Sequence, residues 1–190
     1  MWHFPVENQP ALHVFAQWIR PALRAVRVLD PVPSQWLHLT AQGVGFADEV
    51  SQEDLTAIGA EVAGRLAGFG PITTRLGPLT VDAGGVHLPA DPAAELVRAR
   101  AAIRAGIGQV WGADRVPEAE QGFCPQVSLA YANANANANA DGEPVGPIRQ
   151  ALDGYRESIP VIFDRVSLID LDQDEGQYRW RIVTTLKLGA

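Results

Sequence analysis

The chain has 190 residues, of which 47% are hydrophobic, so it can bury the core of a single globular domain spanning residues 1–190. Its 15 basic and 22 acidic residues give a formal charge of -7, which argues against a protein that holds long duplex nucleic acid but is compatible with a small nucleotide or one RNA terminus. The single cysteine, Cys124, excludes an internal disulfide, and the absence of a long apolar run or a signal-like start predicts a cytoplasmic protein without a membrane span.

The N-terminal part of the chain predicts a strand, a helix and a second strand. Residues 2–5 have the pattern of a short strand, and Pro10 follows a helix-start signal and precedes apolar residues at helical spacing. Pro21 is expected to end or kink this helix, because proline removes a backbone donor. Residues 36–43 predict the second strand.

The middle of the chain predicts two further helices separated by hairpins. Ser51 and Asp54 resemble a capping box and precede an apolar stripe, which predicts the start of the second helix. Glycine and proline punctuate residues 72–88 in a pattern typical of consecutive antiparallel hairpins. The pair Asp91-Pro92 predicts the start of the third helix.

The rest of the chain predicts mainly strands. Residues 126–131, 159–171 and 178–188 are β-like, and an acidic turn joins the last two. The Asn-Ala repeat over residues 132–140 offers no apolar face and is expected to be a mobile surface loop, while residues 147–155 predict a short fourth helix. Because helices are interleaved with hairpins and do not alternate steadily with strands, we expect an α+β fold with antiparallel sheets.

Two of the predicted strands carry the same polar pattern. Successive side chains of a strand point to opposite faces, so His38 shares a face with Thr40, and Gln126 shares a face with Ser128. The apolar residues between and beside them face the other way. If the two strands lie side by side, four polar side chains converge on a site suited to a phosphate.

The segments over residues 33–43 and 123–133 resemble the two signatures of the two-histidine (2H) phosphoesterase superfamily. Within it, the resemblance is to the branch of 2'-5' RNA ligase-like or RNA cyclic phosphodiesterase proteins. Members of this branch carry His-x-Thr or His-x-Ser in both signatures. The chain keeps the first histidine and both hydroxyls, but Gln126 stands where the second histidine is expected.

This resemblance implies both a fold and a reaction. The fold is a duplicated, bilobal one, with antiparallel sheets forming a central V-shaped cleft and helices on the outside. The substrates are 2',3'-cyclic phosphates of RNA ends or nucleotides, opened without a metal or other cofactor. One histidine removes a proton from water while the other protonates the departing ribose oxygen. His38 would then be the surviving acid or base, Thr40 and Ser128 would hold phosphoryl oxygens, and Tyr131 is a candidate to stack on a base.

Gln126 changes the expected activity, because an amide binds a phosphate oxygen but transfers no proton. We therefore expect weak or absent cyclic phosphodiesterase activity. Three explanations stay open: an engineered substitution, a natural binding module for nucleotides or RNA ends, or an enzyme that uses another acid. The spare histidines are His3, His13 and His87, and the sequence gives no reason to place any of them in the cleft. A partner-binding protein that has kept the fold alone is a third class, and a monomer is expected in each case.

Overall fold

The computed structural model describes residues 1–46, 48–133, 149–150, 152, 154–172 and 179–189. Its helices are α1 (Pro10–Arg24), α2 (Gln52–Leu66) and α3 (Ala94–Trp111), with the short 3-10 turns η1 (Ser34–Trp36) and η2 (Ala113–Arg115). Its strands are β1 (Trp2–Pro5), β2 (Leu29–Pro31), β3 (His38–Gln42), β4 (Ile72–Leu76), β5 (Thr80–Asp82), β6 (Gly85–Asp91), β7 (Gln126–Ala132), β8 (Ile159–Phe163), β9 (Arg165–Asp172) and β10 (Arg179–Lys187).

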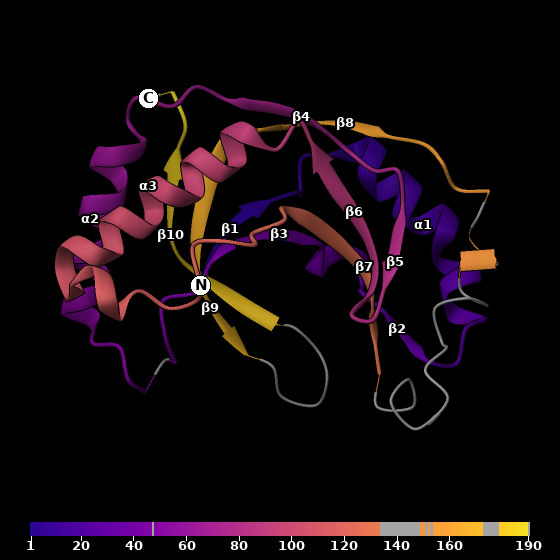
Figure 1. Cartoon of the computed structure of the whole chain (residues 1–190), viewed down its shortest axis with the longest axis horizontal. Coiled ribbons are helices and arrows are strands. Elements are labelled where there is room, and N and C mark those ends of the chain that lie inside the picture. Colours follow the sequence, from indigo (N-terminus) through magenta and orange to yellow (C-terminus); the bar gives the residue numbers. More distant parts are fainter. Residues whose placement is uncertain (47, 134–148, 151, 153, 173–178, 190) are drawn as a thin grey trace.

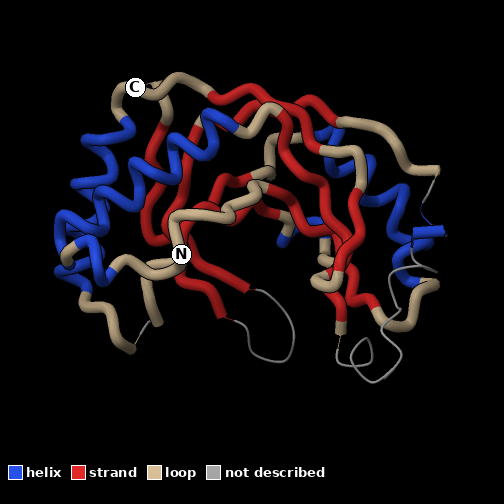
Figure 2. The backbone as a smooth tube through the Cα atoms, in the orientation of Figure 1, coloured by secondary structure: helices blue, strands red, loops and turns tan. Residues whose placement is uncertain are grey.

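The strands form one curled sheet in the order β10-β9-β1-β3-β7-β6-β4-β8, with β2 also on β7 and β5 also on β6. All of its described pairings are antiparallel. The two strands with the polar pattern, β3 and β7, are neighbours in the middle of this order. The strands curl into an arch, with α2 and α3 outside one limb and α1 outside the other (Figures 1 and 2). The α+β class and the antiparallel sheet are therefore as the sequence predicts.

Helix α1 passes through a proline that was expected to end or kink it. The helix continues beyond Pro21 to Arg24, so the prediction that it ends there is wrong. The reason is packing, because Leu23, one turn beyond the buried Ile19, is itself buried and extends the apolar face of the helix. Burying this side chain offsets the backbone hydrogen bond that proline cannot make.

Helix α2 begins as its capping pattern predicts. The side-chain oxygen of Ser51 accepts a hydrogen bond from the backbone N–H of Asp54 at 3.0 Å. The apolar stripe is buried through Ile58, Val62 and Leu66. None of the described helices is both long enough and apolar enough to cross a membrane.

The predicted strand over residues 159–171 is two strands that lie in different parts of the sheet. Strand β8 pairs with β4, whereas β9 pairs with β1 and β10. The residues that join the hydrophobic core cluster change from odd to even numbers between the two strands, and an uninterrupted strand cannot keep both sets on one face. They are Ile159, Val161 and Phe163 in β8, and Val166 and Leu168 in β9, where Ser167 and Ile169 are buried as well.

The hairpins predicted over residues 72–88 are present in part. Strands β5 and β6 form a hairpin, but β4 pairs with β6 and β8 and not with its sequence neighbour β5. The predicted loop over the Asn-Ala repeat from residue 134 onward, most of the acidic turn, and residues 147, 148, 151 and 153 of the predicted fourth helix lie outside the described residues. Residues 149, 150 and 152 are helical.

Gly85, at the start of β6, allows β6 and β7 to approach closely. Its φ is +139°, and a Cβ there would collide with the carbonyl oxygen of Ala130. We predict that Gly85→Ala lowers the free energy of unfolding by about 1–3 kcal/mol, because it adds backbone strain and forces the strands apart. Urea denaturation measures this change.

Gly64→Ala is the matched control, because Gly64 lies at an exposed position of α2 with no atom within 4 Å of the added Cβ. Alanine there is expected to raise stability by about 0.5–1 kcal/mol through helix propensity. Equal stability of the two variants would contradict the close approach of β6 and β7.

Candidate active site

The pairing of β3 with β7 brings the two polar patterns together. The strands are antiparallel and in register at Leu39 and Val127. In an antiparallel pair, the residues on either side of such a position also oppose each other and share a face. The opposed pairs are His38 with Ser128 and Thr40 with Gln126.

The other face of these strands is the apolar floor that the alternation predicts. It consists of buried side chains, namely Leu37, Leu39, Val127 and Leu129. Thr40, Gln126 and Ser128 are half-buried on the opposite face, so they remain accessible to a small ligand.

His38 lies at the start of β3 with only 7% of its surface exposed. Its Nδ1 lies 2.9 Å from the carbonyl oxygen of Trp36, and a carbonyl only accepts, so Nδ1 carries a proton and the lone pair of the neutral ring is on Nε2. Burial lowers the pKa of His38, and the hydrogen bond to Trp36 opposes this in part. The ring is therefore neutral at neutral pH and suited to accept a proton.

His87 lies on the same face, which corrects the expectation that it stays outside the site. Strand β6 pairs with β7 and places His87 opposite Ser128. Its Nδ1 is 3.1 Å from Ser128 Oγ, and its Nε2 is 3.2 Å from Asp82 Oδ1 on the adjoining strand β5. His87 is only 4% exposed. The sequence missed it because register across a hairpin and a neighbouring strand is not visible from spacing alone.

His3 is a third histidine beside the site, which also differs from the expectation. It lies on β1 opposite Thr40, and its ring centroid is 5.9 Å from that of His38 and 5.4 Å from that of Trp180. Only 1% of its surface is exposed, and neither ring nitrogen has a hydrogen-bond partner among the described residues. Burial, followed by the charges of His38 and the N-terminus, lowers the pKa of His3 to about 3.

Trp180 on β10 covers this group of rings. Its centroid lies 5.2 Å from that of His38 and 4.7 Å from that of Trp36, so Trp36 packs against protein. Tyr131 lies further along β7, opposite Gly85, and packs in part against the hydrophobic core. The structure therefore brings Tyr131 onto the motif strand without placing it among the histidines.

His13 is the spare histidine that stays away from the site. It lies on α1, and its Nε2 is 2.9 Å from the carbonyl oxygen of Val6. Within the described part of the chain, no group of three or more His, Cys, Asp or Glu side chains is arranged to hold a metal ion.

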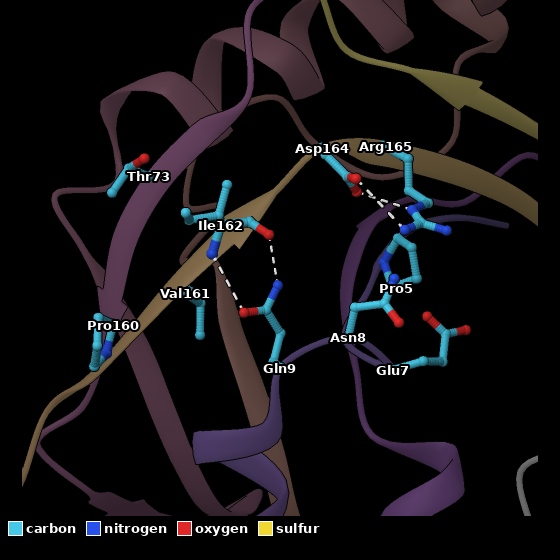
Figure 3. A pocket seen from close by; sticks show the side chains of 10 residues that line it. All are labelled: Pro5, Glu7, Asn8, Gln9, Thr73, Pro160, Val161, Ile162, Asp164 and Arg165. Atoms are coloured by element: carbon cyan, nitrogen blue, oxygen red, sulfur yellow. Dashed lines mark hydrogen bonds and ion pairs between the residues drawn. The ribbon is translucent and has the colours of Figure 1, made fainter.

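A pocket of about 490 Å³ lies elsewhere, between the start of α1 and strand β8 (Figure 3). The Gln9 side chain extends toward β8 and bonds both the backbone N–H and the carbonyl oxygen of Ile162. Strand β8 ends the sheet order, so these bonds satisfy backbone groups that a sheet edge leaves unpaired. This pocket lacks a histidine or a motif residue, so we assign the chemistry to the histidine face.

Comparison with known proteins identifies a family and a shared fold. The profile of the 2'-5' RNA ligase superfamily matches residues 9–175. The structure is similar to TT0787 of Thermus thermophilus with 19% identity and a TM-score of 0.73, over 100% of this chain and 97% of that chain. It is also similar to E. coli LigT complexed with NADP+ (15% identity, TM-score 0.69, 100% and 96% covered) and with 3'-AMP (18% identity, TM-score 0.67, 100% and 97% covered). No curated protein sequence matches the chain.

The depressed pKa of His3 predicts a pH-dependent stability. An unfolded histidine binds a proton below about pH 6.5, whereas folded His3 binds one only near pH 3, so stability is complete above 6.5 and falls as the pH drops toward 3. We predict that, between pH 6 and 4, the free energy of unfolding of the wild type falls by about 1.4 kcal/mol per pH unit more than that of His3→Leu. Urea denaturation at several pH values measures both slopes, with pH 8 as the reference. Parallel slopes would contradict the buried, neutral state of His3.

Proposed function

Because the chain belongs to the 2'-5' RNA ligase superfamily, we propose that it is a 2H phosphoesterase-like protein acting on 2',3'-cyclic phosphates at RNA ends or on free nucleotides. The observation that carries this proposal is the opposition of His38 with Ser128 and of Thr40 with Gln126 on one face of β3 and β7. Two duplicated lobes, each giving one of these strands to a V-shaped cleft, would account for their central position in the sheet.

His38 is the proton acceptor of the proposed reaction. The neutral ring holds its lone pair on Nε2, because Nδ1 donates to Trp36. It would take a proton from the water that attacks phosphorus, while the hydroxyls of Thr40 and Ser128 donate to phosphoryl oxygens. No cofactor takes part in this scheme.

Gln126 occupies the position of the second family histidine in this proposal. Its amide donates to phosphate but cannot protonate a leaving oxygen, so turnover is expected to be low. The E. coli LigT structures with NADP+, ATP and 3'-AMP support a small nucleotide as the ligand type here. Tyr131 would contact the base, and the protein would act as a cytoplasmic monomer on single nucleotides or RNA termini.

We predict that Gln126→His raises hydrolysis of a nucleoside 2',3'-cyclic phosphate by about 10²-fold or more, because one positioned proton-transfer group contributes about 10²–10⁴ in rate. Phosphorus NMR of the cyclic nucleotide with each protein follows ring opening and identifies the product.

Gln109→His is the matched control, because Gln109 is an exposed residue of α3 and gains the same side chain outside the site. It should leave the rate unchanged. A rate for Gln126→His no higher than that of this control would contradict the assignment of Gln126 to the second histidine position.

A binding module for nucleotides or RNA ends is the second candidate function. Gln126 favours it, since the amide keeps hydrogen-bond donors for a phosphate while losing acid-base chemistry. A module of this kind should bind a nucleoside 2'-phosphate in calorimetry and show no turnover of the cyclic form. Thr40→Val should weaken that binding by about 10-fold, the size of one lost hydrogen bond. Unchanged affinity in this variant would argue against both functions.

A further inference from the structure

Three polar side chains form a row across adjacent strands of the sheet. His38 on β3 opposes Ser128 on β7, and Ser128 opposes His87 on β6. Neighbouring strands lie about 4.8 Å apart, so the backbones of the two histidines are about 10 Å apart, with a hydroxyl between them. On β5, Thr80 opposes His87, and Asp82, two residues further along that strand, reaches His87 Nε2 with its Oδ1 at 3.2 Å.

The hydrogen bonds along this row define how a proton can move. The Asp82 carboxylate only accepts, so His87 Nε2 carries a proton, and Nδ1 faces Ser128 Oγ. When the ring is neutral, the Ser128 hydroxyl donates to Nδ1. When the ring is protonated, Nδ1–H donates to Ser128 Oγ, and the ring forms an ion pair with Asp82.

We propose that His87, acting through the hydroxyl of Ser128, delivers the proton to the departing ribose oxygen, in place of the histidine that is absent at Gln126. This inference rests on the proposed cyclic phosphodiesterase function. It accounts for a low rate of turnover without a histidine at position 126. His87 is then a proton-relay residue. The one proton of the Ser128 hydroxyl goes to the leaving oxygen and not to a phosphoryl oxygen, so Thr40 and Gln126 are left to donate to the phosphate.

The step balances as a hydrolysis. A water oxygen bonds to phosphorus, and its proton passes to Nε2 of His38. The bond from phosphorus to one ribose oxygen breaks, and that oxygen takes the proton of Ser128 Oγ. The Nδ1 proton of His87 replaces it on Ser128. The product is a phosphomonoester with a free neighbouring hydroxyl, and exchange with solvent restores both rings.

The surroundings of the two histidines favour these opposite roles. His38 is buried among aromatic rings, and burial lowers its pKa, which suits a base. His87 faces a carboxylate, which suits a ring that must carry a proton before the reaction. The His87 ring hydrogen-bonds with Asp82 from β5 and with the uncharged Ser128 from β7, and the uncharged Thr80 opposes His87 on β5.

The test combines His87→Asn with Gln126→His, using hydrolysis of a nucleoside 2',3'-cyclic phosphate followed by phosphorus NMR. In the wild type, His87→Asn should lower the residual rate about 100-fold, because it removes the acid. In the Gln126→His background, the same change should cost less than about 10-fold, because the restored histidine supplies the proton. His13→Asn is the matched control and should change neither rate.

The pH profile separates a proton relay from a structural role. A relay predicts an alkaline limb in the wild-type rate that His87→Asn lacks, whereas a structural role predicts the same profile in both proteins. Asp82→Asn keeps an acceptor for the Gly84 N–H, which now bonds Asp82 Oδ1 at 2.7 Å, but removes the negative charge. Because it removes the charge beside His87 Nε2, it should lower the wild-type rate and leave the rate of Gln126→His unchanged, without lowering the thermal midpoint.

Each outcome decides the inference. A wild-type rate that survives His87→Asn, an alkaline limb that His87→Asn retains, or a wild type that is inactive while Gln126→His is active would overturn the relay and leave the proposed function standing. Absence of both hydrolysis and binding of the cyclic nucleotide, in the wild type and in Gln126→His, would instead remove the proposed function itself.

Discussion

The antiparallel contact between β3 and β7 is the constraint on which the site depends. The fully buried Leu39 and Val127 oppose each other there. Because side chains alternate with period two, a slip of one residue would turn every polar side chain of one strand into the core and expose its apolar floor. The core therefore fixes the register, and the register places His38 opposite Ser128. Helices α2, α3 and α1 cover the outer sides of the curled sheet (Figure 1).

The three histidines on this face all lie on strands of the sheet, but different groups surround their rings. His3 is enclosed without a hydrogen-bond partner among the described residues, so it stays neutral and contributes a ring to the packing beneath Trp180. His38 has its Nδ1 bonded to a backbone carbonyl, which fixes the tautomer. His87 lies between a hydroxyl and a carboxylate. The chemical difference between these rings comes from their neighbours and not from the strand positions that carry them.

Local pattern predicted the motif strands, the capped helix and the α+β class, because each depends on residues close in sequence. It did not predict where β8 and β9 pair, because a strand's partners depend on the whole sheet. The histidines illustrate the same limit. His3, His38 and His87 each lie in a strand between two apolar residues, whereas His13 lies in a helix. That shared pattern is visible in the sequence and marks three candidates, but only the order β1-β3-β7-β6 shows that they share a face.

The register also arranges the polar side chains of this face in two rows, to which the proposal gives different roles. One row crosses the strands through His38, Ser128 and His87, and the next row crosses them through Thr40 and Gln126. A histidine at position 126 would lie diagonal to His38, so a line from base to acid would cross both rows. A line from His38 to His87 stays within one row and has Ser128 at its centre. In-line displacement at phosphorus requires the attacking and leaving oxygens on opposite sides. With His87 as the acid, as proposed, the line of displacement would turn toward the direction perpendicular to the strands, and the second row would be left to hold the phosphate.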